Sequence, residues 1–492
     1  MTPPIRRETR PNVLFVTVDQ FRGDSLSCAG HPTVRTPNLD HLASHGVRLA
    51  RHYSQAAPCA PGRAALYTGT YQLNNRVVAN GTPLDDRFDN VARMAARVGY
   101  RPTLFGYTDQ GVDPRTVEPG DPRLSTYEGV LPGFTSALDL TGDHLPYLDW
   151  LRSLGHEVTD ALIALATEHD RPSDHSHSAF LTNHLIEWIE RQQSPWFAHA
   201  SYLRPHPPYC AAGRYATLYD GADCPAPLPA LADADRHRLY ESFLNNPELA
   251  ASLHPMTVPE IQAQYYGMIS EVDAHLGRIW NALKSCGAWE DTIIIVTSDH
   301  GEQLGDQGLL GKAGFFESSY HIPGLIRDPS QPRAHGRVID EFTENVDIFP
   351  TLCEAIGAPV PTQCDGLPLT AFLRGGEPPF WRDAATWEWD WRDSFITHEP
   401  PPWPWDQRLE RQHLVVRRSA SHAYVHFGNG TSLCFDLAAD PTWQTRERDP
   451  AVILTMTQDM LTWRSTHTER TLTGMLLEHG GIGRVPTRRP GV

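Results

Sequence analysis

The stretch Val13-Leu-Phe-Val-Thr-Val-Asp-Gln20 decides the fold. Its first six residues form an unbroken apolar and β-branched run, which is typical of a parallel strand covered on both faces. The run stops at Asp19 and Gln20. A short loop then leads to a predicted helix, with Thr36 as its N-cap and Pro37 in its first position. The order of strand, loop and helix predicts an α/β unit.

The same alternation recurs along the chain. The predicted elements are a helix over 90–98, strands over 102–107 and 196–202, a long helix over 260–283 and a strand over 292–298. The last strand runs directly into Asp299-His300. Ligands of doubly wound sheets bind beyond the carboxyl ends of the strands, so we expect Asp19-Gln20 and Asp299-His300 to meet at one edge.

The character of the sequence changes near residue 400, where Pro400-Pro-Pro-Trp-Pro-Trp405 predicts a crossing between domains. Before it, Trp387, Trp389 and Trp391 alternate with acidic residues, which is the period of a half-buried strand. Beyond it, the pattern predicts short strands over 414–418, 423–427 and 432–437 and a helix over 451–464. We therefore divide the chain into a catalytic α/β domain, residues 1–400, and a small antiparallel α+β domain with a tail, residues 401–492.

The composition is that of a large globular protein. A chain of 492 residues, 40% hydrophobic, has room for one large domain and a smaller one. Its formal charge of -17 argues against nucleic acid and anionic membranes as partners, because both are bound through Lys and Arg. The apolar run 13–18 is too short for a membrane span or a signal-peptide core, so we expect a cytoplasmic protein. The eight cysteines contain no CxxC pair and predict neither a disulfide framework nor a structural zinc site.

The segment Cys59-Ala-Pro-Gly-Arg63 is the most specific feature. It resembles the C-x-P-x-R signature of the sulfatase family, in which a dedicated enzyme oxidises the cysteine to formylglycine. The resemblance covers nearly the whole chain and implies an alkaline-phosphatase-like fold, with a mostly parallel sheet and helices on both faces. The alternative is a buried, inert cysteine. A helix that starts near Cys59 would favour an anion there, through its free N–H groups and Arg63.

A hydrated aldehyde at position 59 explains the chemistry that the resemblance implies. It offers two hydroxyl groups on one carbon: one attacks sulfur or phosphorus, and the other drives the C–O cleavage that expels sulfate or phosphonate. One site can therefore serve both sulfur and phosphorus esters.

Four residues at two strand ends match the metal ligands of the family, namely Asp19, Gln20, Asp299 and His300, and Cys59 completes the set. Oxygen ligands suit Ca²⁺ or Mg²⁺, but an imidazole and only two formal negative charges favour Mn²⁺ or Zn²⁺. Common sulfatases carry an acid in place of Gln20 and an asparagine in place of His300. We expect Mn²⁺, with Zn²⁺ and Ca²⁺ as alternatives.

Two residues match the positions that assist the leaving group, Lys312 in Leu310-Gly-Lys312 and His206 in Arg204-Pro-His-Pro-Pro208. General acid catalysis there would contribute about two to four orders of magnitude in rate. The alternatives are a solvated lysine and a histidine in a rigid proline loop. By the same resemblance, Asn80 and Tyr107 donate hydrogen bonds to the non-bridging oxygens, and Arg63 supports the formylglycine.

The match goes further, to the branch of arylsulfatases and phosphonate monoester hydrolases. Many sulfatases have Gly-Lys-x-His where this chain has Gly106-Tyr-Thr-Asp109, so two cations are missing and singly charged esters should be preferred. Asp109 replaces the hydroxyl residue expected in phosphonate hydrolases. If its carboxylate lines the pocket, it repels the substrate or recruits a cationic leaving group.

We therefore predict formylglycine-dependent, metal-assisted hydrolysis of sulfate monoesters, with phosphonate monoesters and phosphodiesters as further substrates. One alternative is a phosphonate monoester hydrolase or phosphodiesterase as the main activity. Others are an enzyme that uses unmodified Cys59 as a thiolate and a catalytically silent metal-binding relative. The resemblance also implies a formylglycine-generating enzyme as partner and a homodimer or homotetramer, with the C-terminal tail as a candidate contact.

Overall fold

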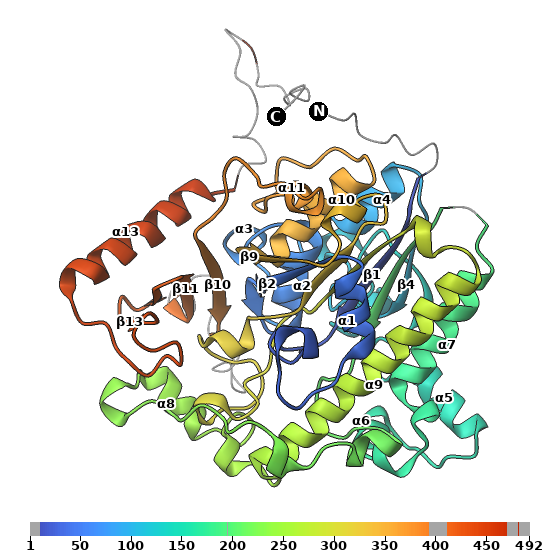
Figure 1. The fold of residues 1–492 in the computed structure, drawn as a ribbon, viewed down its shortest axis with the longest axis horizontal. Coiled ribbons are helices and arrows are strands. Elements are labelled where there is room, and N and C mark those ends of the chain that lie inside the picture. The colour runs from blue at the N-terminus through green and yellow to red at the C-terminus, as the bar shows by residue number, and fades with distance from the viewer. Residues whose placement is uncertain (1–9, 194, 393–410, 470–480, 482–492) are drawn as a thin grey trace.

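Strand β1 (Asn12–Val18) lies inside an eight-stranded sheet, as its apolar run predicts. The computed structural model describes residues 10–193, 195–392, 411–469 and 481 (Figure 1). β1 pairs in parallel with β6 and with β7, and the strand order is β5-β4-β6-β1-β7-β8-β2-β9. Among the described strands of this sheet, β8 alone runs antiparallel to its neighbours. The other strands are β2 (Val47–Tyr53), β4 (Pro102–Gly106), β5 (Thr135–Asp139), β6 (Phe197–Tyr202), β7 (Thr292–Thr297), β8 (Gly324–Arg327) and β9 (Arg337–Glu344).

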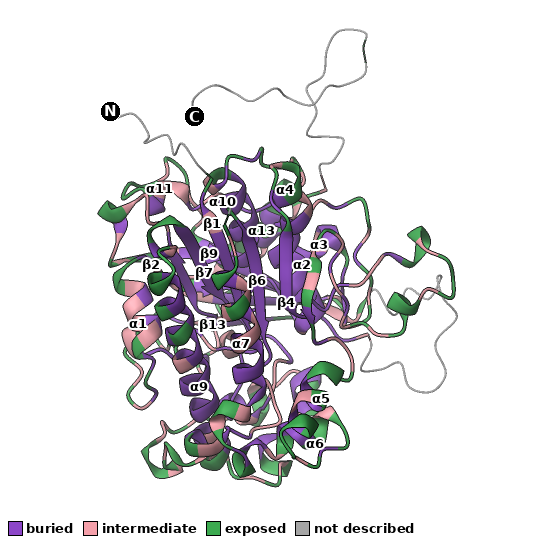
Figure 2. Cartoon of the chain, turned by 90° about the vertical axis from the view of Figure 1, so that its right-hand side faces the viewer, coloured by how far each residue is buried: buried purple, intermediate pink, exposed green. Residues whose placement is uncertain are grey.

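Helices cover both faces of this sheet (Figures 1 and 2). Leu14 and Val16 of β1 belong to one core, to which α1, α5, α6, α7 and α9 contribute, and Val13 and Phe15 belong to a second core with α2, α4, α10 and α11. These helices are α1 (Pro37–Ser44), α5 (Leu145–Ser153), α6 (Ala161–Ala166), α7 (His177–Glu190), α9 (Val258–Ser285), α2 (Cys59–Thr68), α4 (Val91–Arg97), α10 (Ile348–Ala355) and α11 (Thr370–Leu373); α3 (Gln72–Asn75) and α8 (Arg238–Leu244) also lie before residue 400. The predicted α/β class is confirmed.

The start of α1 differs from its prediction in one respect. The helix begins at Pro37, but the side chain of Thr36 makes no capping hydrogen bond. Asp273 of α9 takes that role, because its carboxylate accepts hydrogen bonds from the backbone N–H groups of Asn38 and Leu39 at 3.1 and 2.8 Å. A carboxylate from a distant helix thus satisfies free N–H groups that the sequence assigned to a local cap.

A second, five-stranded sheet has the order β13-β12-β11-β10-β3. Its strands are β3 (Ala56–Ala57), β10 (Ala384–Asp390), β11 (His413–Ser419), β12 (His422–Phe427) and β13 (Ser432–Asp436). The half-buried strand predicted at the tryptophans is wrong, since every residue of β10 is buried. One face of the sheet packs on Phe315 and Phe316, and α13 (Pro450–Thr466) covers the other. The acidic residues of β10 are accommodated by hydrogen bonds, such as that from Leu73 N to Glu388 at 2.7 Å.

The small sheet reaches the start of α2, because β3 ends two residues before Cys59 and pairs with β10. It draws strands from both sides of residue 400, and the antiparallel strands predicted beyond that point are present. The predicted crossing at 400–405 and the tail, apart from Gly481, lie outside the described residues. The division at residue 400 stays a prediction.

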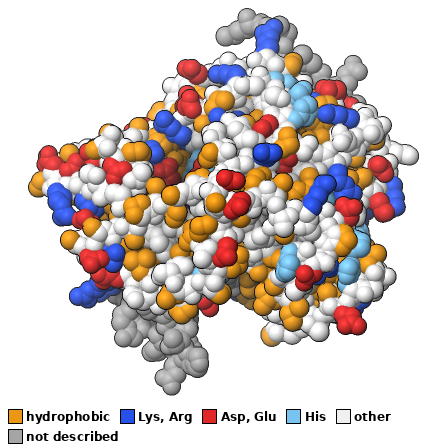
Figure 3. Space-filling model, turned by 60° about the horizontal axis from the view of Figure 1, so that its bottom comes forward, with side chains coloured by type: hydrophobic (Ala, Val, Ile, Leu, Met, Phe, Trp, Pro, Cys, Tyr) orange, Lys and Arg blue, Asp and Glu red, His pale blue; other side chains and the backbone are white. Residues whose placement is uncertain are grey.

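Acidic and basic side chains are interspersed over the face drawn in Figure 3. In the part of the chain that the structure describes, no helix combines the length and the apolar character that a membrane crossing requires.

Candidate active site

The ends of β1 and β7 and the start of α2 meet at one point, as predicted. Asp19 follows β1, Asp299 and His300 follow β7, and Cys59 is the first residue of α2. One potential ligand atom from each of these four residues lies within 4.8 Å of all the others, and all four residues are buried. Two carboxylates, an imidazole and a sulfur atom so arranged are a plausible donor set for one divalent cation.

The sulfur atom of Cys59 lies at the centre of this cluster. Its Sγ atom is 2.9 Å from Lys312 Nζ, 3.3 Å from His300 Nε2 and 4.0 Å from Asp19 Oδ1. Burial, followed by the charge of Asp19, raises the pKa of the Cys59 thiol well above its usual range. Without a bound cation the unmodified thiol is therefore protonated at neutral pH, which disfavours a simple thiolate nucleophile.

Arg63 ties the strand ends together. Its guanidinium is fully buried and donates from Nε to Asp299 Oδ2 and from Nη2 to Asp19 Oδ2, both at 3.0 Å. Nη1 donates to Ser201 Oγ at 2.8 Å, at the end of β6. The guanidinium also lies over the ring of Tyr107, 4.5 Å from its centroid. Arg63 thus holds both carboxylates of the donor set in place.

Gln20 is held in a conformation that residues other than glycine rarely adopt, with φ of 64°. Its backbone N–H donates to Asp299 Oδ1 at 3.2 Å, and its carbonyl accepts from the Tyr265 hydroxyl at 2.6 Å. Its side-chain nitrogen donates to Glu302 Oε2, and its Oε1 accepts from Lys312 at 3.1 Å. Such strain persists only where the surroundings fix it, and it often marks a functional site.

A loop anchored on Glu302 brings Lys312 to the cluster. Glu302 Oε1 accepts from the backbone N–H groups of Leu304 and Gly311, at 2.8 and 2.6 Å. Burial alone would lower the pKa of Lys312, but negative charge on residue 59, where it is present, and the carboxylates of Asp19 and Asp299 outweigh burial and raise that pKa above its usual value. Lys312 is therefore charged and close to the nucleophile position. The alternative interpretation of Lys312 as a solvated surface lysine is therefore wrong.

Helix α2 packs directly on the backbone of the strand end. A Cβ atom on Gly62 would lie 2.4 Å from the carbonyl oxygen of Asp299 and 2.9 Å from that of Ala56. Only glycine permits this approach, so the third residue after Cys59 helps to set the distance between Cys59 and Asp299.

The three residues predicted to bind substrate, Asn80, Tyr107 and Asp109, lie around the cluster, and each of them also contacts another group of the protein. Asn80 Oδ1 accepts from Ala60 N at 3.0 Å and so caps α2. The Tyr107 hydroxyl donates to Asp19 Oδ2 at 2.7 Å. The predicted roles of Asn80 and Tyr107 towards the ester oxygens stay predictions. The Tyr107 hydroxyl proton is used in the hydrogen bond to Asp19.

Asp109 pairs with Arg63, at 3.2 Å between its Oδ2 and the guanidinium Nε. It is buried, with φ of 52°. Burial raises the pKa of Asp109 to about 8, although the charge of Arg63 opposes this effect. With a pKa of about 8 the carboxyl group is mostly protonated near pH 7, so it lies against Arg63 largely as a neutral group.

His206 lies in the loop after β6, and its Nδ1 is 2.8 Å from the carbonyl oxygen of Pro207. Burial and then the charge of Lys312 lower the pKa of His206 to about 4, while Asp19 acts in the opposite direction. In the free site the imidazole is mostly neutral at pH 7, with its Nδ1 proton in the bond to Pro207. A bound anionic ester would raise this pKa.

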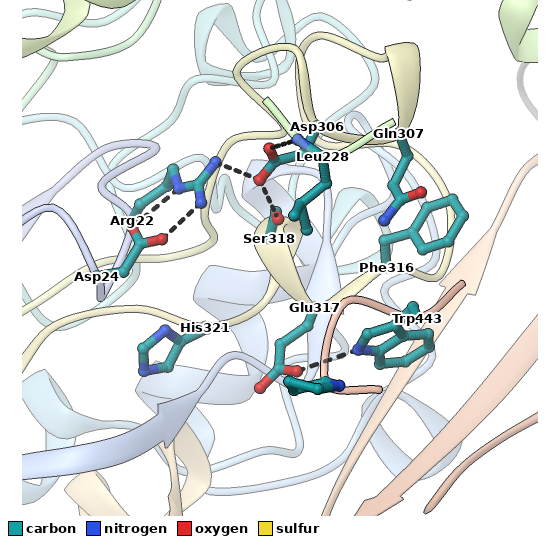
Figure 4. Close-up of a pocket in the computed structure, with 11 residues that line it drawn as sticks. Arg22, Asp24, Leu228, Asp306, Gln307, Phe316, Glu317, Ser318, His321 and Trp443 are labelled. Carbon is teal, nitrogen blue, oxygen red and sulfur yellow. Dashed lines mark hydrogen bonds and ion pairs between the residues drawn. The ribbon is translucent and has the colours of Figure 1, made fainter. Parts of the chain in front are cut away.

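A cavity of about 160 Å³ is lined by Arg22 and Asp24 from the segment after β1 and by Asp306 and Gln307 from the segment after β7 (Figure 4). Arg22, two residues after Gln20, points between Asp24 and Asp306, and its Nη1 donates to the carbonyl oxygen of Gln303 at 3.2 Å. The cavity contains none of the predicted catalytic residues. Its ion pairs tie the segment after β1 to the segment after β7.

Several functional neighbours were not found from the sequence. They are Ser201, which binds Arg63; Tyr265 and Glu302, which fix Gln20; and Gln110, which donates to the Ala60 carbonyl at 2.6 Å. Ser201 and Glu302 could have been predicted from one feature of the sequence, because each lies near the carboxyl end of a predicted strand.

A mostly parallel sheet that gathers acids, imidazole and lysine around a cysteine at a helix start defines an ester hydrolase with an alkaline-phosphatase-like fold. The sulfatase family model matches residues 11–358, and the chain belongs to the sulfatase family. The predicted family, fold and enzyme class are thereby confirmed.

Relatives of known kind cover almost the whole chain. It is 36% identical to the multifunctional alkaline phosphatase superfamily protein PehA of Trinickia caryophylli, over 94% of this chain and 97% of that protein. An arylsulfatase of Clostridium perfringens is 27% identical over 83% of this chain and 88% of its own length. The crystal structure of a phosphonate monoester hydrolase of Agrobacterium radiobacter superposes with a TM-score of 0.89 and 43% identity, over 98% of this chain and 100% of that chain.

Proposed function

We propose that this chain hydrolyses sulfate monoesters, aryl sulfates above all, with further activity on phosphonate monoesters and phosphodiesters. The observation that carries the proposal is the position of Cys59 Sγ, between Lys312, His300 and Asp19. This sulfur atom stands in for the oxygen atoms of hydrated formylglycine, which we propose is formed from Cys59 by a formylglycine-generating enzyme. Hydrated formylglycine supplies a hydroxyl nucleophile and a second hydroxyl that releases the bound product.

The donor set suits one divalent cation. Asp19, Asp299 and His300 would hold it together with Gln20 and residue 59, and we propose Mn²⁺, with Zn²⁺ or Ca²⁺ as alternatives, because an imidazole joins the oxygen ligands. When bound, the ion lowers the pKa of a coordinated hydroxyl group and polarises the ester. The part of Arg63 is to keep the Asp19 and Asp299 carboxylates in position.

The remaining residues bind the ester and stabilise the leaving group. The amide nitrogen of Asn80 is the donor of that side chain left for a non-bridging oxygen, because its oxygen caps α2. Lys312 places a permanent positive charge 2.9 Å from the nucleophile position, where negative charge builds up on the ester. The His206 imidazole, protonated once an anionic ester is bound, donates its proton to the departing oxygen.

A phosphonate monoester hydrolase as the main activity is the second candidate. The observation in its favour is the structural similarity to two such enzymes, from Agrobacterium radiobacter and from Silicibacter pomeroyi; the second superposes with a TM-score of 0.84 and 32% identity. Aryl sulfates and phosphonate monoesters are both singly charged, so the charge of the site does not separate them.

The decisive experiment compares kcat/KM for an aryl sulfate and an aryl phosphonate monoester with the same phenol. The protein is co-produced with a formylglycine-generating enzyme and loaded with Mn²⁺, Zn²⁺ or Ca²⁺ in parallel, and the peptide with residue 59 is checked by mass spectrometry. Higher kcat/KM for the sulfate supports the main proposal, and the reverse supports the second. Full activity with an unmodified thiol would refute formylglycine chemistry, and conversion without hydrolysis would identify a catalytically silent relative.

We further propose a cytoplasmic homodimer or homotetramer. Sedimentation velocity of the full chain tests the assembly, and a monomer at micromolar concentration would refute it. Cell fractionation tests the location.

A further inference from the structure

Arg204 lies two residues before His206, and its side chain is completely buried. Its Nη1 atom donates to the carbonyl oxygens of His206 and Pro208, both at 2.9 Å. Its Nε and Nη2 atoms donate to Glu168 Oε2 at 2.8 and 2.5 Å. One guanidinium therefore binds the backbone carbonyls of His206 and Pro208 and connects the loop to the buried carboxylate of Glu168.

The loop depends on this outside donor because it is rich in proline. Pro205, Pro207 and Pro208 have no backbone N–H group, so the loop cannot satisfy its own carbonyl groups in the usual way. Among the described residues, the N–H and imidazole of His206 bond only to near neighbours, from the N–H to the Leu203 carbonyl at 3.0 Å and from Nδ1 to that of Pro207. Arg204 supplies the donors that fix where the loop lies.

Glu168 is fixed in turn by a regular element. Its Oε1 accepts from His177 N, the first residue of α7, at 2.8 Å and from the Tyr147 hydroxyl at 3.3 Å. A carboxylate at a helix N-terminus also interacts favourably with the helix dipole. The connection from α7 through Glu168 and Arg204 to the His206 loop therefore begins on a rigid helix that packs on the sheet.

A contribution to folding stability does not by itself explain why the Arg204–Glu168 ion pair is buried. Burying two charges is costly, and an apolar replacement of similar shape is often neutral or stabilising. What Arg204 provides and an apolar residue would not is directed hydrogen bonds to the carbonyls of His206 and Pro208. We infer that Arg204, held by Glu168, is a positioning residue that aims the His206 imidazole at the leaving-group oxygen. The inference rests on the role of His206 in the proposed function.

The test is the dependence of kcat/KM on the leaving group. The variants Arg204→Lys and Glu168→Gln, each with its folding checked by chemical unfolding, are assayed with aryl sulfates of strongly and weakly acidic phenols. An acidic phenol leaves without a proton, whereas a weakly acidic one needs it. We expect both variants to lose about 10- to 100-fold more activity on the weakly acidic phenol, the loss that a misplaced general acid causes. If Arg204→Lys does not fold, the leaving-group dependence of kcat/KM in Glu168→Gln, which preserves the shape of the side chain, tests the inference.

Controls separate this inference from the proposed function. Arg382→Lys alters a guanidinium that is 13% exposed and pairs with Glu344 and Asp347 rather than with the His206 loop, and it should change kcat/KM for both substrates by the same factor. The double variant Arg204→Lys/His206→Ala should be no worse than His206→Ala, because Arg204 acts through His206.

Three results would overturn the inference in distinguishable ways. Arg204→Lys and Glu168→Gln could lose the same factor in kcat/KM on both phenols while His206→Ala loses more on the weakly acidic one. That result would reject the positioning role of Arg204 and leave the proposed function intact. Equal losses in His206→Ala itself would reject its role in proton donation. No hydrolysis of either ester class by fully converted wild-type enzyme would reject the proposed function.

Discussion

Replacing Gly62 by alanine tests whether the packing of α2 on the strand end sets the geometry of the site. The new Cβ atom would lie 2.4 Å from the Asp299 carbonyl oxygen, closer than the 3.0 Å below which real contacts essentially never occur. Either the carbonyl group or α2 must move by about 0.6 to 1.0 Å to restore a contact of 3.0 to 3.4 Å. Both movements separate Cys59 from Asp299.

A shift of this size has two measurable effects. Overpacking typically costs about 1–3 kcal/mol of unfolding free energy. Misplacing reacting groups by about 1 Å lowers the rate about 100-fold. We therefore expect Gly62→Ala to lose about 1–3 kcal/mol in chemical unfolding and about two orders of magnitude in kcat/KM on an aryl sulfate.

The assay needs two safeguards. Activity is divided by the fraction of residue 59 converted to formylglycine, measured by mass spectrometry, because the substitution lies inside the motif that the maturation enzyme reads. Gly376→Ala serves as control, since a Cβ atom there meets nothing closer than 3.5 Å. Wild-type stability and kcat/KM in Gly62→Ala would refute the reasoning, as would a loss of stability with full activity.

Three further predictions follow from individual side chains. Lys312→Ala should lower kcat/KM about 100- to 10,000-fold, whereas Lys284→Ala, which removes the chain's other lysine, should change it less than about twofold; equal effects would contradict the role of Lys312. Asp109→Asn should change the sulfate-to-phosphonate ratio of kcat/KM by less than about threefold, because the carboxyl group, with a pKa of about 8, is already mostly uncharged near pH 7 and lies against Arg63; a change of about tenfold would show instead that a charged Asp109 lines the pocket. Burial raises the pKa of Asp273 to about 6, above an unfolded value of about 3.9, so the folded state holds the proton more tightly and stability falls as pH rises through this window. In Asp273→Asn, the loss of unfolding free energy between pH 4 and pH 6.5, measured by urea unfolding, should be smaller than in the wild type by about 2–3 kcal/mol. The nearby Asp40 is present in both proteins and serves as an internal control. Identical pH profiles of the two proteins would contradict the raised pKa.

The sheet and the meeting of its strand ends were predictable because the signals are local. Val13–Val18 is apolar on both faces, and the rule for parallel sheets places Asp19 beside Asp299 whatever their separation in sequence. The Cys59 motif predicted in addition that a helix begins near Cys59, close to both strand ends. These features do not depend on the packing of any particular side chain.

The errors and omissions concern groups whose partners are distant in sequence. Thr36 has the sequence of an N-cap, but Asp273 of another helix supplies the acceptor. β10 alternates like a strand with one solvent-exposed face, yet Glu388 on that face accepts a hydrogen bond from Leu73 N and lies 3.9 Å from Arg464 of α13, and alternation cannot reveal such distant partners. Asp109 was read as a possible free charge because nothing local shows that Arg63 lies 3.2 Å away.

The two cations of the site have different electrostatic roles. Arg63 contacts the carboxylates of Asp19 and Asp299 and the mostly protonated carboxyl group of Asp109, so its positive charge is already balanced inside the protein. Lys312 contacts an amide oxygen and the sulfur of Cys59, so its charge acts chiefly on whatever occupies the nucleophile position and its substrate. With the divalent ion that we propose, a site with one such cation would compensate a singly charged ester and its developing negative charge better than a phosphate monoester dianion. The charge balance therefore rests on Asp19 and Asp299 as partners of Arg63, and on Tyr107 and Asp109 standing where many sulfatases carry two cations; we expect it to favour singly charged esters.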